Sequence, residues 1–218
     1  MAEEITTAHS GTRKATGGAQ AKLHEQLDLR PGDALLIVDL QRDFLPGGAL
    51  GVPEGDQVIA PLNDYITAFE ERKLPIFMTR DWHPPDHCSF RSAGGPWPPH
   101  CVRDTPGAQW PESLKIAPSA RIISKATEPA AEAYSGFSGT ELLTLLRDQG
   151  VRRLFVGGLA TDYCVRATVL DARSHEFEVV VLADAIRGVN VQPGDDERAV
   201  GEMLASGAAL FDPARSPN

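Results

Sequence analysis

Four residues with chemically active side chains lie at or just beyond the ends of apolar runs in the sequence. Asp39 follows ALLIV, Asp81 ends LPIFMTRD, Lys125 lies in RIISKA, and Cys164 comes shortly after RLFVGGLA. A cysteine thiolate is a nucleophile, a neighbouring ammonium stabilises it, and a carboxylate can carry its proton to a leaving group. The side chains of Asp39, Lys125 and Cys164 therefore predict acyl-transfer chemistry if the fold brings them together.

Cys164 lies in the first turn of a helix predicted for residues 161–175. The free N–H groups and the macrodipole of a helix start favour negative charge, so we expect a lowered pKa for this thiol. The same N–H groups can hold an oxyanion. Each residue alone has a structural interpretation, since a lone cysteine is more often a small buried apolar residue and an aspartate after a strand is commonly a turn residue. Their shared location favours catalysis.

A second group of candidate residues lies in the segment DWHPPDHCSFRSAGGPWPPHC, which begins at Asp81. Asp81 and His83 are two residues apart, so both side chains can point to one side of an extended chain. His100, returned by the loop, would complete a carboxylate and two imidazoles, which suits Zn²⁺, Fe²⁺ or Mn²⁺. Two alternatives stay open. The histidines can hydrogen-bond the loop backbone, or Cys88 and Cys101 can hold a structural zinc.

Apolar runs alternate with helical patterns along the chain. The runs predict strands over 34–40, 74–81, 121–126, 153–160, 179–186 and 208–211, and the spacing predicts helices over 58–69, 140–150, 161–175 and 195–207. This alternation is typical of a doubly wound, mostly parallel six-stranded sheet with helices on both faces, a three-layer α/β/α fold. Ligands of such sheets bind at the carboxyl ends of the strands, where the candidate residues would gather.

Length and composition indicate one domain, because 218 residues with 42% hydrophobic content can bury a large core. We expect a mobile or loosely docked extension over 1–30, a single domain over 31–212 and a frayed tail over 213–218. The net charge of −9 argues against nucleic-acid and anionic-membrane partners. Three cysteines without a CxxC pair, and no apolar run of signal or spanning length, predict a soluble cytoplasmic protein with free thiols.

Six motifs, VDLQRDF, DWHPPDHCSF, GPWPPHC, SKATEP, AYSGF and GGLATDYCVRAT, together resemble the nicotinamidases (pyrazinamidases) of the isochorismatase-like cysteine hydrolase superfamily. The resemblance runs over about 34–211. It implies a catalytic triad of Asp39, Lys125 and Cys164. It also implies a cis peptide bond before Ala160 and an oxyanion hole formed by the backbone N–H groups of Ala160 and Cys164.

The metal loop is part of the same resemblance. It implies that Asp81, His83 and His100 bind one divalent ion, with zinc expected ahead of iron or manganese. His87 lies near or in the coordination sphere in some members of the family and is a further candidate ligand.

The implied reaction is hydrolysis of nicotinamide to nicotinate and ammonia through a nicotinoyl thioester on Cys164, as in NAD salvage, with pyrazinamide as a further substrate. Phe44 and Trp97 match residues that enclose the pyridine ring, and Tyr134 would add a wall to the pocket. One alternative is an amidase of the same superfamily for another carbamoyl or aromatic amide. A mononuclear iron oxygenase is another, and it would leave Cys164 idle. Homo-oligomers are common in the family.

Overall fold

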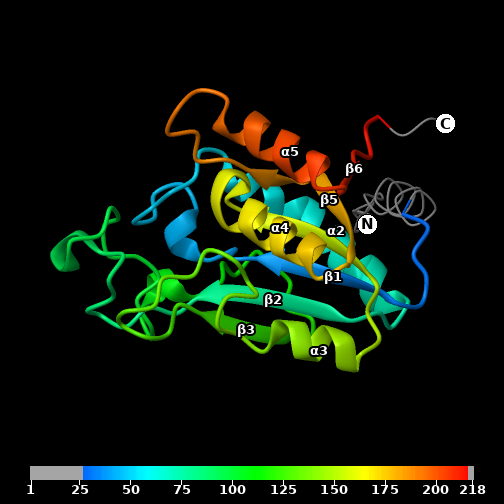
Figure 1. The fold of residues 1–218 in the computed structure, drawn as a ribbon, viewed down its shortest axis with the longest axis horizontal. Helices are drawn as coiled ribbons and strands as arrows, with labels where there is room; N and C mark the ends of the chain where they lie inside the picture. The colour runs from blue at the N-terminus through cyan, green and yellow to red at the C-terminus, as the bar shows by residue number, and fades with distance from the viewer. Residues whose placement is uncertain (1–26, 216–218) are drawn as a thin grey trace, which may run out of the picture.

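The computed structural model describes residues 27–215, which form a six-stranded sheet in the order β3-β2-β1-β4-β5-β6 (Figure 1). Every neighbouring pair of strands is parallel. The strands are β1 (Asp33–Val38), β2 (Ile76–Asp81), β3 (Arg121–Lys125), β4 (Arg153–Leu159), β5 (Glu178–Arg187) and β6 (Ala209–Phe211). The predicted six-stranded parallel sheet is confirmed.

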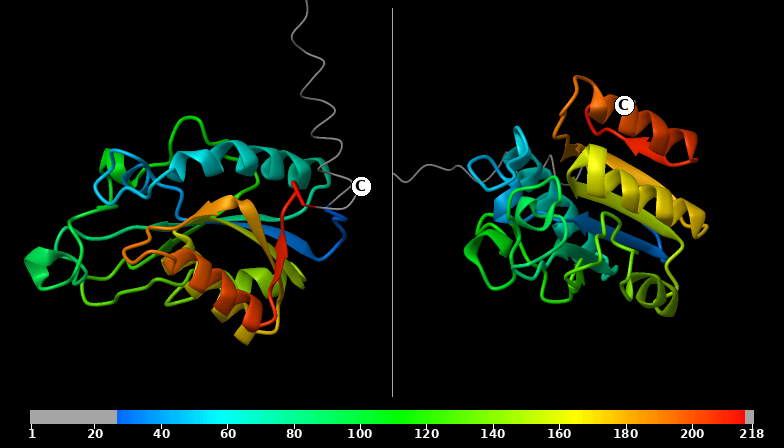
Figure 2. Two further views of the ribbon diagram at one scale, coloured as in Figure 1. Left: turned by 90° about the horizontal axis from the view of Figure 1, so that it is seen from above. Right: turned by 60° about the vertical axis from the view of Figure 1, so that its left-hand side comes forward.

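Helices cover both faces of the sheet, as Figure 2 shows from two directions. Helix α2 (Ile59–Glu71) packs on one face, and α3 (Leu142–Asp148), α4 (Arg166–Ser174) and α5 (Asp195–Ala205) pack on the other. Short helical turns are η1 (Arg42–Phe44), η2 (Gly55–Val58), η3 (Arg91–Ala93), η4 (Pro106–Ala108) and the π-helical turn η5 (Thr161–Val165). The predicted three-layer arrangement is therefore confirmed.

The central strand β1 is apolar from Ala34 to Val38 because both of its faces are covered. Leu35 and Ile37 belong to the core beneath α2, whereas Leu36 and Val38 belong to the core beneath α3 and α4. Successive side chains of a strand point to opposite faces, so a strand between two helical layers needs a continuous apolar run. This requirement accounts for the sequence DALLIV of β1.

The order of the strands reverses between β1 and β4, since the chain builds outward from β1 through β2 to β3 and then returns to β4. The crevice at the carboxyl ends of two such strands is the usual ligand site of a doubly wound sheet. Here the two strands approach each other very closely. Gly158 has a φ of +123°, and a Cβ atom at this position would lie 2.1 Å from the carbonyl oxygen of Val38. Only glycine permits this approach, which brings the end of β4 against the end of β1.

The long segment between β2 and β3 lies at the same carboxyl edge of the sheet, at the left of Figure 1. At the beginning of the described chain, Leu27 is 3% exposed and packs in the core beneath α2. The predicted division into 1–30, 31–212 and 213–218 stays a prediction, because most of the extension and the end of the tail lie outside the described residues. Within residues 27–215, no helix combines the length and the apolar character needed to cross a membrane.

Candidate active site and metal centre

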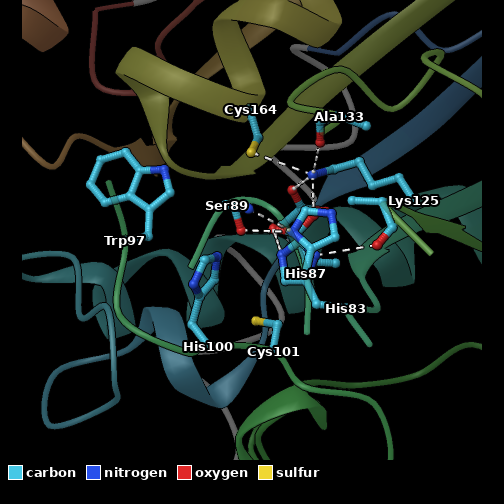
Figure 3. Close-up of polar contacts among 12 residues, drawn as sticks. His83, His87, Ser89, Trp97, His100, Cys101, Lys125, Ala133 and Cys164 are labelled. Atoms are coloured by element: carbon cyan, nitrogen blue, oxygen red, sulfur yellow. Dashed lines mark hydrogen bonds and ion pairs between the residues drawn. The ribbon is translucent and has the colours of Figure 1, made fainter. Parts of the chain in front are cut away.

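The three residues predicted as a catalytic triad meet at the crevice between β1 and β4. Asp39 follows β1 directly, Lys125 ends β3, and Cys164 lies in η5 after β4. The Lys125 ammonium is 2.9 Å from Asp39 Oδ2 and donates a hydrogen bond of 3.5 Å to Cys164 Sγ. Figure 3 shows Lys125 and Cys164 pointing toward each other. The structure thus brings a thiol, an ammonium and a carboxylate into mutual contact.

Asp39 is completely buried and has a backbone φ of +46°. Burial raises the pKa of this carboxyl, and the Asp81 charge adds to the rise, while Lys125 and the Thr79 hydroxyl act in the opposite direction. Thr79 donates a hydrogen bond of 2.7 Å to Asp39 Oδ1. A carboxylate with a raised pKa is a stronger base than an exposed one, which suits Asp39 for proton transfer.

Lys125 is the only cation among the buried side chains of the described chain. Burial works against its charge, but the carboxylates of Asp39 and Asp81 outweigh that effect and hold its pKa well above the ordinary value. The ammonium forms an ion pair with Asp81 and donates to the carbonyl oxygen of Ala133 at 2.9 Å. Lys125 therefore stays charged and joins the catalytic group to a predicted metal ligand.

The lowered pKa predicted for Cys164 is wrong for this structure. Burial raises the pKa of the thiol well above its ordinary value, and the nearby charge of Lys125 only partly offsets the burial. The carboxylate of Asp39 also disfavours the thiolate. The helix start favours the thiolate of Cys164, but the loss of hydration on burial disfavours it more strongly here. The Cys164 thiol is thus neutral in this structure and would need a base to act as a nucleophile.

The peptide bond between Leu159 and Ala160 is cis, as the resemblance implied. The helix that follows opens with the π-turn η5, and such turns are common at functional sites. Within it, the amides of Tyr163 and Val165, on either side of Cys164, both donate to the carbonyl oxygen of Ala160. These bonds turn the backbone around the thiol. Ala160 and Cys164 both line the pocket described below, as an oxyanion hole at these residues requires.

The predicted metal ligands also meet. Carboxylate and imidazole atoms of Asp81, His83 and His100 lie within 4.8 Å of one another, and all three residues are buried. His83 Nδ1 is 3.3 Å from the carbonyl oxygen of Ala126, and His100 Nδ1 is 2.8 Å from that of Pro98. A carbonyl oxygen only accepts, so each Nδ1 carries a proton, which leaves Nε2 as the ring atom that can bind a metal ion.

The protonation state of this cluster suits a metal ion. His83 Nε2 is buried without a hydrogen-bond partner and lies 3.7 Å from Asp81 Oδ2. Burial lowers the pKa of His100, which keeps its imidazole neutral. Burial acts to raise the pKa of Asp81, but Lys125 and His83 hold it below its usual range. One carboxylate and two imidazoles that both hold their Nδ1 atoms against carbonyl oxygens therefore fit a divalent ion.

His87 does not join this ligand group. Its Nδ1 lies 2.7 Å from the hydroxyl of Ser89 and its Nε2 lies 3.1 Å from the carbonyl oxygen of Ala131, so both nitrogens have other partners. Its ring packs on that of His83 with 4.2 Å between the centroids. His87 therefore packs against the predicted ligand His83 in this structure. Among residues 27–215, no group of three metal-binding side chains contains Cys88 or Cys101, which removes the support for a thiolate zinc site.

One pocket is lined by residues of the predicted catalytic group and of the predicted metal cluster. Cys164 and Ala160 line it, and so do Asp81 and His100. Its volume is about 40 Å³, so the pocket is narrow. The predicted residues Phe44, Trp97 and Tyr134 all line it, and Trp97 Nε1 donates to the Tyr134 hydroxyl at 3.1 Å. Flat apolar walls with a few polar groups suit an aromatic amide.

Sequence reasoning missed three residues of the site. Tyr163 lines the pocket and packs edge-on against Trp97, with 5.3 Å between the ring centroids. Gln41 is buried, donates to the carbonyl oxygen of Asp81 at 2.8 Å and accepts from the amide of Asp81 at 2.8 Å. Thr79 is the hydrogen-bond donor to Asp39. Only their positions in the sequence could have indicated them. Tyr163 directly precedes Cys164, Gln41 follows closely after Asp39, and Thr79 comes shortly before Asp81.

Comparisons with known proteins agree with this geometry. The isochorismatase domain family matches residues 33–214. A nicotinamidase from Escherichia coli is 41% identical over 202 residues, which cover 83% of this chain and 95% of the relative. The crystal structure of a Pyrococcus horikoshii pyrazinamidase in complex with zinc is 54% identical, with a TM-score of 0.80 and coverage of 84% of this chain and 99% of that one.

A structure of PnC1 from L. infantum in complex with nicotinate is 36% identical, with a TM-score of 0.78 and coverage of 84% of this chain and 94% of that one. Similarity of sequence and of fold thus extends over nearly the whole length of these relatives. The chain belongs to the isochorismatase family.

Proposed function

We propose that this protein is a nicotinamidase, a cysteine amidohydrolase that converts nicotinamide to nicotinate and ammonia. The observation that carries the proposal is one pocket that holds the Cys164 thiol beside Asp39 and Lys125 and, on its other side, the carboxylate–imidazole cluster. The relatives named nicotinamidase and pyrazinamidase support it. Pyrazinamide has the same ring size and the same carboxamide, so we expect it to be hydrolysed as well.

In the first half of the reaction, Asp39 takes the proton of the Cys164 thiol while the Lys125 ammonium stabilises the thiolate that forms. The sulfur adds to the amide carbonyl carbon, and the backbone N–H groups of Ala160 and Cys164 bind the resulting oxyanion. Asp39 then gives its proton to the amide nitrogen. The C–N bond breaks, ammonia leaves, and a nicotinoyl thioester remains on Cys164.

In the second half, Asp39 takes a proton from a water molecule as its oxygen adds to the thioester carbonyl. The same N–H groups hold the second oxyanion, the C–S bond breaks, and the sulfur of Cys164 recovers the proton from Asp39. Nicotinate is released. One carboxylate thus acts alternately as base and acid, which its burial favours by raising its pKa.

We propose that Asp81, His83 and His100 hold the divalent ion, with zinc expected ahead of iron or manganese. When bound, the ion supplies a Lewis-acidic position suited to the nitrogen of a pyridine ring. The side chains of Phe44 and Trp97 would hold the faces of that ring. His87 orients His83 through ring packing and stays outside the ligand set.

The test measures ammonia release from nicotinamide by the purified protein, as isolated, after removal of metal with a chelator, and after addition of zinc, iron or manganese. We expect release to fall on metal removal and to return with the added ion. Benzamide, which lacks the ring nitrogen, is the matched control substrate and should react poorly. No release from nicotinamide by folded, metal-loaded protein would refute the proposal in favour of another amide.

Measuring dioxygen consumption beside ammonia release separates the remaining alternative. An iron oxygenase would use the metal cluster without the thiol, so the Cys164→Ala variant would keep its activity and consume dioxygen. We also propose a cytoplasmic location, which the free thiols of Cys88, Cys101 and Cys164 support.

A further inference from the structure

The Lys125 ammonium lies at the centre of a second group of metal-binding side chains. Ligand atoms of Asp39, Asp81 and Cys164 lie within 4.8 Å of one another, and all three residues are buried. Asp81 belongs both to this group and to the cluster with His83 and His100. Two sites that could each hold a divalent ion therefore adjoin and share one carboxylate.

The group formed by Asp39, Asp81 and Cys164 contains a softer ligand atom, the sulfur of Cys164, than the group with the two histidines. A cysteine thiolate binds zinc, cobalt and other borderline metals strongly, and two carboxylates would complete a three-ligand site. Asp39 Oδ2 is buried, has the ammonium at 2.9 Å as its ion-pair partner, and accepts no hydrogen bond from any other group of the described chain. A divalent ion drawn to this region would thus find a carboxylate oxygen and a sulfur suited to it, and binding there would inactivate the nucleophile.

The ammonium of Lys125 already lies between the side chains of Asp39, Asp81 and Cys164. It forms ion pairs with Asp39 and Asp81 and donates to Cys164 Sγ at 3.5 Å, so it contacts all three members of the group. The carbonyl oxygen of Ala133, 2.9 Å away, fixes it from a fourth direction (Figure 3). These contacts have the form of a coordination shell with a nitrogen cation in place of a metal.

We propose that the Lys125 ammonium occupies a latent second metal site and thereby keeps divalent ions off the nucleophile Cys164. This role is separate from stabilising the thiolate. It explains how the Cys164 thiol can stay free of metal beside a cluster suited to zinc. The Lys125 ammonium would repel a divalent ion at this position and would compete with it for the carboxylate oxygen atoms of Asp39 and Asp81. The inference concerns metal binding only, so its test does not depend on which amide the protein hydrolyses.

The test uses cobalt(II), whose bonds to thiolate sulfur give a charge-transfer band that bonds to oxygen and nitrogen do not. Apo protein is titrated with cobalt while the band and the bound metal are measured. We expect the wild-type protein to bind cobalt without this band. Lys125→Met, which keeps the side-chain length and removes the charge, is expected to bind a further equivalent and to show the band. Adding Cys164→Ser to Lys125→Met should abolish the band.

Removing the ammonium leaves two buried carboxylates unpaired, a change that is strongly destabilising in folded proteins. Lys125→Met is therefore accompanied by Lys125→Met with Asp39→Asn, which restores the net charge of the group and keeps the carboxylate of Asp81 and the thiol. Circular dichroism checks the fold of each variant. A thiolate band in either folded variant, absent from the wild type, supports the proposal. A thiolate band in wild-type protein, or its absence from the folded variants, overturns it.

Discussion

Replacing Thr79 by Val removes one hydroxyl and keeps the shape of the side chain, so it removes the short hydrogen bond to the Asp39 carboxylate together with a longer one, of 3.3 Å, that the hydroxyl accepts from the Asp39 amide. The Thr79 hydroxyl is buried and donates to Asp39 Oδ1 at 2.7 Å. A hydrogen bond to a charged group contributes about 1.5–3 kcal/mol, and one pKa unit corresponds to about 1.4 kcal/mol. Loss of this bond disfavours the carboxylate, so we expect the pKa of Asp39 to rise by about 1–2 units.

The direction of the pH effect follows from the role as a base that we propose for Asp39. Burial already raises the pKa of Asp39, and Thr79→Val raises it further. Because the base must be deprotonated, kcat/KM for nicotinamide should begin to fall at a higher pH than in the wild type, with the acidic limb displaced by about 1–2 pH units. Any effect of the bound ion on Asp39 is common to both proteins and cancels in the comparison.

The assay is ammonia release by metal-saturated protein across the acidic range. Thr79→Ser is the matched control, because it keeps the hydroxyl and should keep the wild-type limb. The linkage between protonation and folding adds a second readout. A carboxyl whose folded pKa is raised loses stability as the pH rises through that pKa, so Thr79→Val should lose more stability at neutral pH than at acidic pH. If the acidic limb of kcat/KM lay at the same pH in Thr79→Val and Thr79→Ser, the predicted effect of the hydroxyl on the pKa of Asp39 would be refuted.

Three further outcomes are expected. Cys164→Ala should abolish ammonia release while circular dichroism shows an unchanged fold, and residual turnover would contradict a covalent intermediate. His100→Ala should weaken zinc binding in equilibrium dialysis by more than the ~10–100-fold typical of outer-sphere changes, and activity should fall with metal content. Gln41→Ala leaves the amide and carbonyl of Asp81 without their buried partner, so urea titration should show a loss of about 3 kcal/mol in unfolding free energy, and an unchanged midpoint would refute this role.

The fold was predictable because the sheet is buried on both faces. Its strands therefore read as apolar runs, and the predicted bounds of β4 differ from the observed Arg153–Leu159 by one residue. The meeting of the residues predicted as a triad was predictable for a related reason, since parallel strands bring Asp39 and Lys125 to one edge of the sheet. Tyr163 and Gln41 were missed because their roles depend on which loops pack around them, and no local pattern reports that packing.

Residue types at the strand ends thus determined by themselves that a thiol, an ammonium, a carboxylate and a metal-binding loop would share one edge of the molecule. Tertiary structure alone decided how these groups are charged. The neutral thiol of Cys164 and the partners of His87 both follow from burial and from neighbours distant in sequence. The same holds for Lys125, which joins Asp39 to Asp81. Periodicity in a sequence reports which face of an element is buried, whereas hydration and electrostatic energies depend on distances that only the folded chain sets.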